Sequence, residues 1–205
     1  ARARGVTVQR DIAVPMPDGV TLLADHYAPE GTDSAPAVLI RSPYGRTGPL
    51  NFVALMARLM AERGYHVVLQ STRGTFGSGG PFEPFVHEAS DGPATLDWIA
   101  AQPWFNGSLG LWGLSYLGIT QWAVAADAPP FVKALVPQVT STFFWRMFYR
   151  GGAFDLESAL LWAYIVSIQE GSALQFILGM AGQKSALAPG YSKVPLRGAD
   201  AVVAW

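Results

Sequence analysis

The chain has 205 residues, 50% of them hydrophobic and 14% charged, with a formal net charge of −1 at pH 7. This composition fits one globular domain with a large core and excludes a disordered chain. The near-neutral charge gives no electrostatic reason to expect a nucleic acid or an acidic membrane surface as a partner. Cysteine is absent, which excludes disulfides, thiolate metal sites and a cysteine nucleophile. The cytoplasm is the default expectation for such a chain.

The predicted strands and helices alternate along the first two thirds of the chain. In chain order we expect strands at 7–14, 20–27 and 37–40, a helix at 52–63, a strand at 66–69, a helix at 88–101, a strand at 109–112, a helix at 116–126 and a strand at 132–136. This alternation is typical of an α/β fold, a mostly parallel sheet with helices on both faces. The turn Pro17-Asp18-Gly19 adds an antiparallel hairpin at the sheet edge.

The amino-acid composition of the sequence changes near residue 140. Aromatic residues crowd 143–149, and 156–168 and 173–180 have the pattern of helices. No stretch reaches the roughly 18 uninterrupted apolar residues of a membrane span; the nearest, 153–168, carries two acidic residues. We therefore expect an α/β core over 1–140 and a helical cap insertion over 141–205, with no membrane association.

One short segment combines a strand, a sharp turn and a helix around a serine. Gly113 precedes Ser115 by two positions, and an apolar strand and a helix flank them. A strained strand-to-helix turn presents a serine hydroxyl at the sheet edge. The free amides and dipole of the following helix favour the oxyanion that forms during ester or amide cleavage. Ser115 is therefore the candidate nucleophile.

The segment departs from the strict pattern G-x-S-x-G, because position 117 is leucine and the next glycine is Gly118. A Gly-x-Ser triplet by itself is common in proteins. The alternative interpretation of Ser115 is an ordinary helix N-cap serine.

The residues around Ser115 resemble the nucleophile region of the bacterial cocaine esterase family. That family belongs with the Xaa-Pro dipeptidyl-peptidase-like hydrolases, the α-amino-acid ester hydrolases and the glutaryl acylases, all with the α/β-hydrolase fold. Beside Ser115-Tyr116-Leu117-Gly118, the resemblance rests on these segments: Pro15-Met16-Pro17-Asp18-Gly19-Val20, Ser42-Pro43-Tyr44-Gly45, Thr72-Arg73-Gly74, Asp97-Trp98-Ile99 and Gln102-Pro103-Trp104. It extends from about residue 10 to about residue 165.

The resemblance implies specific roles for five residues. Ser115 would form an acyl-enzyme, and two donors would hold the oxyanion: the backbone N–H of Tyr116 and the hydroxyl of Tyr44. Trp162 and Phe148 would line an acyl pocket in the cap. Without the resemblance, Tyr44 is a surface turn residue, and both aromatic residues are equally compatible with a helix core.

The rest of a catalytic triad is not evident in the sequence. All three histidines, His26, His66 and His87, precede Ser115, whereas the α/β-hydrolase order is Ser, Asp or Glu, then His. Of the acidic residues after Ser115, none is assigned to the triad: Asp127, Asp155, Glu157, Glu170 and Asp200. We expect the missing acid and base to lie beyond residue 205, and the strand at 132–136 to form an uncovered, aggregation-prone edge. Structural roles are expected for His26 and His66, while His87 is a remote substitute base.

Three functions remain open at this stage. The first is a serine hydrolase acting on a small-molecule ester, an amide or a short peptide. The second is a non-catalytic remnant or scaffold, which the lack of a later histidine favours. The third is nucleotide binding by the glycine-rich stretch 74–80, but this lacks the Gly-Lys-Ser/Thr and the directly following helix of a phosphate loop. No cofactor or metal is expected, and the oligomeric state is undetermined.

Overall fold

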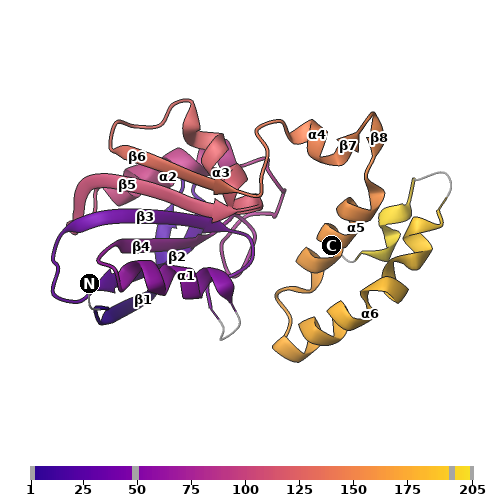
Figure 1. Cartoon of the computed structure of the whole chain (residues 1–205), viewed down its shortest axis with the longest axis horizontal. Coiled ribbons are helices and arrows are strands. Elements are labelled where there is room, and N and C mark those ends of the chain that lie inside the picture. Colours follow the sequence, from indigo (N-terminus) through magenta and orange to yellow (C-terminus); the bar gives the residue numbers. More distant parts are fainter. Residues whose placement is uncertain (1–2, 48–50, 194–196, 204–205) are drawn as a thin grey trace. The chain divides into compact units, whose positions relative to one another are not determined.

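The structure is a computed structural model that describes residues 3–47, 51–193 and 197–203. It divides into two compact units, residues 1–142 and residues 143–205 (Figure 1). Each unit is described by itself.

The first unit is built on a six-stranded sheet. Its strands are β1 (Val6–Pro15), β2 (Thr21–Pro29), β3 (Ala35–Ser42), β4 (His66–Ser71), β5 (Phe105–Leu114) and β6 (Val132–Gln138). They lie in the order β1-β2-β4-β3-β5-β6. Strands β3 to β6 run parallel, and β2 is antiparallel to both β1 and β4. The predicted mostly parallel sheet with an antiparallel opening hairpin is confirmed.

Burial along the strands follows from their place in the sheet. All six residues of β4 are buried, as expected for a central parallel strand covered on both faces. Strand β1 alternates between partly buried and exposed positions over much of its length, because one of its faces meets water. Among the described strands β6 lies at the other end of the sheet, as predicted.

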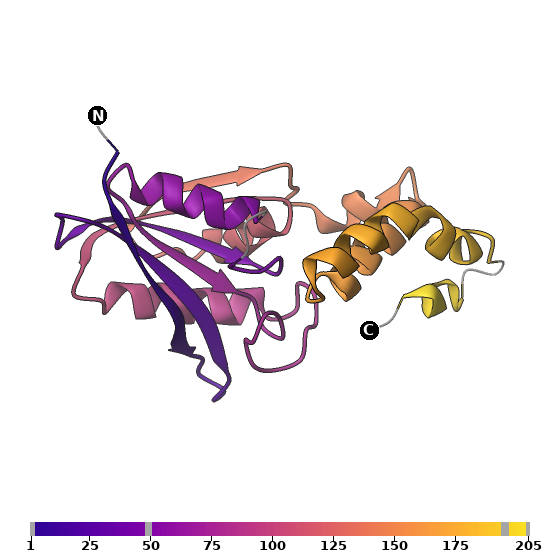
Figure 2. The same ribbon diagram turned by 90° about the horizontal axis from the view of Figure 1, so that it is seen from below.

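Three helices cover the sheet: α1 (Phe52–Ala61), α2 (Glu88–Ala100) and α3 (Tyr116–Ala125). Helix α1 begins where the side chain of Asn51 accepts a hydrogen bond from the N–H of Ala54 at 3.0 Å. It lies on one face of the sheet, and α2 lies on the other, packed against α3 (Figure 2). The predicted arrangement of helices on both faces is therefore also confirmed.

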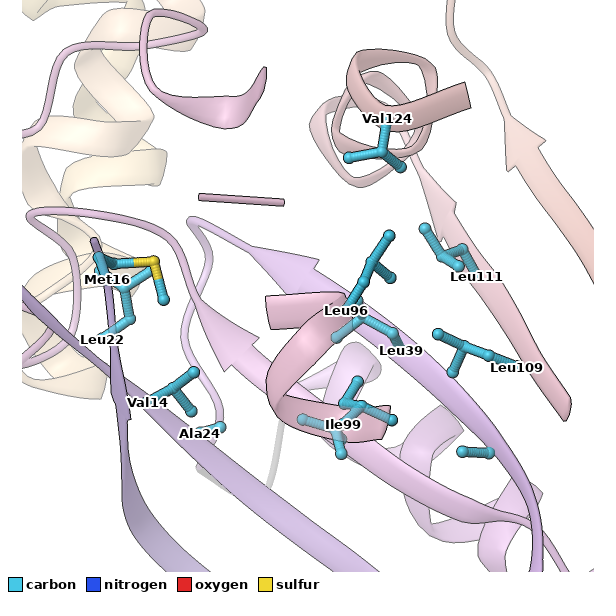
Figure 3. Close-up of a cluster of buried hydrophobic side chains, with 12 residues drawn as sticks. Val14, Met16, Leu22, Ala24, Leu39, Leu96, Ile99, Leu109, Leu111 and Val124 are labelled. Atoms are coloured by element: carbon cyan, nitrogen blue, oxygen red, sulfur yellow. The ribbon is translucent and has the colours of Figure 1, made fainter. Parts of the chain in front are cut away.

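The core between the sheet and helices α2 and α3 is aliphatic (Figure 3). Leu96 and Ile99 of α2 and Val124 of α3 lie over β3 and β5, where Leu39, Leu109 and Leu111 face them. Each fully buried side chain of this size stabilises the fold by about 1.5–3 kcal/mol. This packing fixes α2 and α3 against the strands whose ends carry the candidate site.

The second unit is mainly helical. It contains α4 (Phe144–Phe148), the short strands β7 (Tyr149–Arg150) and β8 (Ala153–Phe154), α5 (Leu156–Ile168), α6 (Ala173–Tyr191) and the 3₁₀ turn η1 (Ala199–Val202). The ring of Trp145 stacks on Tyr149 with 3.7 Å between the ring centroids. In the described ranges, no helix is both long enough and apolar enough to cross a bilayer.

Helix α6 is longer than the sequence predicts: it continues to Tyr191 instead of ending at Met180. Gly182 and Pro189 favour an earlier end, because both residues disfavour a helix interior. Tertiary packing overrides this preference. Leu187 is buried with Leu160 of α5, and a Cβ on Gly190 would meet the Ala199 carbonyl oxygen at 2.9 Å.

Candidate active site

Ser115 occupies a strained turn between β5 and α3. Its φ angle is +56°, in the left-handed region that non-glycine residues rarely adopt. The Ser115 N–H donates a hydrogen bond to the carbonyl oxygen of Gln138, the last residue of β6, at 2.8 Å. Strain of this kind persists only when the surrounding structure enforces it, and it is common at functional sites.

Close packing explains the two glycines that flank Ser115. A Cβ on Gly113 would lie 2.2 Å from the Cβ of Leu117, and one on Gly118 would lie 2.6 Å from Cγ2 of Thr140. The leucine that replaces the second glycine of G-x-S-x-G is itself buried. The turn thus keeps its tightness through Gly113, and Gly118 lets α3 approach the segment after β6.

The hydroxyl of Ser115 does not serve as a helix cap in the described structure. Ser115 stands at the N-cap position of α3, but its side chain makes no capping hydrogen bond. The residue is partly exposed, and the first turn of the helix holds no acidic side chain that would oppose a negative charge. This geometry favours the nucleophile interpretation over the N-cap interpretation.

Tyr44 lies at the same edge of the sheet as Ser115. Strands β3 and β5 are parallel neighbours, with Leu39 level with Leu111. Tyr44 follows β3 by two positions, and Ser115 directly follows β5. The backbone of Tyr44 is fixed by two hydrogen bonds: its N–H donates to Ser42 Oγ at 3.0 Å, and its carbonyl oxygen accepts from Asn51 at 3.2 Å.

The side chain of Tyr116 points into the protein and anchors the start of α3. Its hydroxyl donates to Oε1 of Glu88 at 2.8 Å and accepts from the N–H of Phe85 at 3.0 Å. Burial and the neighbouring Glu88 carboxylate raise the pKa of the Tyr116 phenol, which therefore stays protonated. The side chain of Tyr116 is thus occupied by contacts inside the protein, and its role as an oxyanion donor through the backbone N–H stays a prediction.

A buried charge network below the turn was missed by the sequence analysis. Arg41 contacts Glu88 at 2.7 Å, and Arg73 binds both carboxylate oxygens of Asp91, at 2.6 and 3.0 Å. The hydrogen bonds that Arg73 donates to Asp91 and Asp18 raise the pKa of its guanidinium. Arg73 stands out in the sequence through its Thr-Arg-Gly motif, but no local pattern indicates which acids pair with it.

Two of the histidines lie at the other end of the strands from Ser115, where the parallel strands begin. His26 of β2 and His66, the first residue of β4, approach each other at 3.0 Å between Nε2 and Nδ1. Both rings stack on Trp104, with centroids 4.3 and 4.9 Å away. Burial lowers the pKa of His26 to about 4, and it also lowers the pKa of His66. Both rings are neutral and packed in the interior, which agrees with the structural roles expected for His26 and His66.

His87 and Asp155 have partners other than Ser115. The ring of His87, at the N-cap position of α2, contacts Glu83 at 2.8 Å. Asp155 is partly buried and caps α5, because its side chain accepts a hydrogen bond from the Ser158 N–H at 3.1 Å. Asp127, Glu157 and Glu170 are exposed. Asp200 lies in η1, but its side chain is outside the described structure.

The glycine-rich stretch 74–80 wraps around Arg73 and the neighbouring loop. A Cβ on Gly74 would meet the backbone nitrogen of Phe82 at 2.2 Å, and one on Gly80 would meet Arg73 at 2.9 Å. The next helix, α2, carries Glu88 and Asp91 in its first turn, which disfavours a bound phosphate. The packing of these glycines accounts for them without a nucleotide.

The two predicted pocket residues belong to the second unit. Trp162 lies in α5 and Phe148 ends α4, and both are partly buried. Their assignment to an acyl pocket stays a prediction. Within the described ranges, no group of three or more His, Cys, Asp or Glu side chains is placed to hold a metal ion.

Comparisons with known proteins give a consistent family. Residues 18–185 match the family described as X-Pro dipeptidyl-peptidase (S15 family). Cocaine esterase from Rhodococcus sp. (strain MB1 Bresler) is 36% identical over 164 residues, which are 78% of this chain and 29% of that protein. The chain therefore spans less than a third of the length of this curated relative.

Solved structures of related hydrolases share the fold. A CocE/NonD family hydrolase from Staphylococcus aureus matches with a TM-score of 0.71 and 27% identity, over 80% of this chain and 33% of that one. An α-amino acid ester hydrolase matches with a TM-score of 0.67 and 26% identity, over 88% of this chain and 36% of that one. The fold is thus that of the α/β-hydrolases, and the chain belongs to the X-Pro dipeptidyl-peptidase (S15) family of hydrolases.

Proposed function

We propose that this chain carries the nucleophile of a serine hydrolase, and that Ser115 is that nucleophile. The Oγ atom attacks the carbonyl carbon of an ester or amide, its proton passes to a base, and the alcohol or amine leaves. Water then hydrolyses the acyl-enzyme and restores the serine. The observation that supports this proposal most is the Ser115 turn. Its backbone has a left-handed φ angle, and the Ser115 hydroxyl makes no capping hydrogen bond at the start of α3.

Two donors are proposed for the oxyanion: the backbone N–H of Tyr116 and the hydroxyl of Tyr44. The first is the opening amide of α3, where the helix dipole favours negative charge. The second comes from the segment after β3, the neighbour of β5 in the sheet. Loss of one such donor typically lowers the rate by about 10²–10³.

The proposed substrates are small esters, amides or short peptides. The relatives include one named for cocaine ester cleavage, one named for α-amino acid esters and a family named for X-Pro dipeptides. Their common chemistry is acyl transfer to water, and this supports the reaction class. Trp162 and Phe148 are proposed as pocket residues for the acyl group.

A substrate panel tests this proposal on the natural protein in which these residues occur. The panel contains an aromatic ester, an α-amino-acid ester and an Xaa-Pro dipeptide anilide, with Ser115→Ala as the control. Hydrolysis of any of these that is lost in Ser115→Ala supports the proposal and identifies the substrate class. Hydrolysis that persists in Ser115→Ala contradicts it.

A non-catalytic scaffold is the second candidate. The observation that favours it is the absence of any histidine after Ser115 in these 205 residues. The three histidines present lie in other surroundings, two against Trp104 and one against Glu83. A folded natural protein that hydrolyses none of the panel would favour this scaffold.

A further inference from the structure

The side chain of Tyr116 is held by residues that come about 30 positions earlier in the chain. Its hydroxyl lies between Oε1 of Glu88, at 2.8 Å, and the N–H of Phe85, at 3.0 Å. Its ring stacks on that of Phe85 with 4.7 Å between the centroids. Only 2% of Tyr116 is exposed, so water cannot replace these partners if one is removed.

Glu88 is itself fixed to the centre of the sheet. Its Oε2 atom contacts the guanidinium of Arg41 at 2.7 Å, and both side chains are buried. Arg41 is the penultimate residue of β3, and its Nε donates to Gln70 of β4 at 2.8 Å. The contacts thus form a continuous path from the two central strands through α2 to the first residue of α3.

This path ends on a strained backbone. Ser115 has a φ of +56°, and Phe85, which also binds Tyr116, has a φ of +71°. Non-glycine residues keep such angles only where neighbouring contacts enforce them. The Tyr116 side chain contributes such contacts on the helix side of the Ser115 turn.

We propose that Glu88 is a positioning residue for the nucleophile: by holding the Tyr116 hydroxyl, it fixes the peptide between Ser115 and Tyr116 and the direction of the Tyr116 N–H. The inference rests on the proposed function in one respect, the use of that N–H for the oxyanion. An oxyanion donor must lie 2.7–3.1 Å from the developing charge. A displacement of about 1 Å can cost roughly 10²-fold in rate.

A matched control exists on the other side of the sheet. Tyr27 of β2 is 3% exposed, and its phenol lies close enough to the charges of Asp25 and Arg10 for them to act on its pKa. Tyr27→Phe and Tyr116→Phe therefore remove the same atom from equally buried tyrosines. An effect confined to Tyr116→Phe cannot come from the loss of a buried hydroxyl in general.

The first readout is hydrogen exchange, followed by mass spectrometry on the full natural chain and independent of activity. In Tyr116→Phe we expect peptides that span 113–119 to exchange about tenfold faster, with peptides from β3 and β4 unchanged. Glu88→Gln keeps an acceptor for the hydroxyl and should show a smaller increase. Unchanged exchange in Tyr116→Phe, or an equal increase at 113–119 in Tyr27→Phe, would overturn the proposal.

The second readout is the split between kcat and KM for an ester substrate. We expect Tyr116→Phe to lower kcat about tenfold with KM unchanged, because the N–H contributes mainly in the transition state. Tyr27→Phe should leave both constants unchanged, and an unchanged kcat in Tyr116→Phe would overturn the positioning role. If the unsubstituted protein hydrolyses none of the panel substrates, the proposed function fails by itself, and hydrogen exchange alone decides on Glu88.

Discussion

Buried polar groups differ between the carboxyl edge of the sheet, where the parallel strands end, and the amino edge, where they begin. At the carboxyl edge, below Ser115, charged groups are buried in pairs: Arg41 with Glu88, and Arg73 with Asp91. At the amino edge, His26 and His66 are buried as neutral rings against Trp104. Ion pairs fix directions through several short contacts, whereas stacked neutral rings mainly fill space. The directional contacts lie at the edge where the candidate chemistry needs fixed geometry.

The largest expected effect comes from removing one member of a carboxyl-edge ion pair. Asp91→Ala leaves the Arg73 guanidinium buried without the acid that binds it at 2.6 Å. We expect a loss of about 3–5 kcal/mol in the free energy of unfolding, measured by denaturant titration. Asp18→Ala is the control, because Asp18 binds the same arginine from a side chain that is 54% exposed. An equal loss in both variants would show that burial does not determine the effect.

The second effect tests the tightness of the Ser115 turn. Gly113→Ala places a Cβ 2.2 Å from Leu117, and we expect a loss of about 1–3 kcal/mol in stability together with loss of hydrolase activity. Gly110→Ala lies on the same strand, where the nearest atom to the new Cβ is 3.9 Å away. That control should change stability by about 0.5 kcal/mol or less. Unaltered activity in Gly113→Ala would contradict the described turn.

The third effect belongs to the amino edge and depends on pH. The pKa of His26 is about 4 in the folded protein, below the ordinary value of 6.5. Between these values the unfolded chain binds the proton more readily, so stability falls as the pH falls through this window. From pH 7 to pH 5 we expect a loss of about 1–2 kcal/mol in the free energy of unfolding.

His26→Phe is the variant for this prediction, since it keeps an aromatic ring against Trp104 and removes the titrating group. Its stability should depend less on pH between 7 and 5 than that of the unsubstituted protein. The same pH dependence in both proteins would show that a group other than His26 causes the loss of stability.

The smallest effect concerns the segment after β6. Val139 has a φ of +47° and is 86% exposed, so a β-branched residue holds a strained position without burying its side chain. We expect Val139→Gly to raise the melting temperature slightly, by relief of about 1 kcal/mol of strain. A lower melting temperature would indicate that the valine makes a stabilising contact.

The order and type of the elements in the first unit followed from local patterns, whereas the contacts around Ser115 did not. Ser115 was recognised because strand, glycine and helix are adjacent in the sequence. Glu88 acts on the Ser115 turn through its hydrogen bond with Tyr116, which joins residues 28 positions apart in the chain. Glu88 is in turn bound by Arg41, which lies a further 47 positions earlier. The predicted end of α6 at Met180 was wrong for a similar reason. Gly190 packs against Ala199, and this contact outweighs the local preference of glycine and proline against a helix interior.

The most direct test of the account is covalent labelling of Ser115. A fluorophosphonate probe is added to the natural protein in which these residues occur, and the intact mass is read with Ser115→Ala as the control. Such probes report a nucleophilic serine that has a working base and oxyanion donors. The account predicts one adduct per chain in the unsubstituted protein and none in Ser115→Ala. A folded protein without an adduct, or an adduct that survives Ser115→Ala, would contradict Ser115 as the nucleophile.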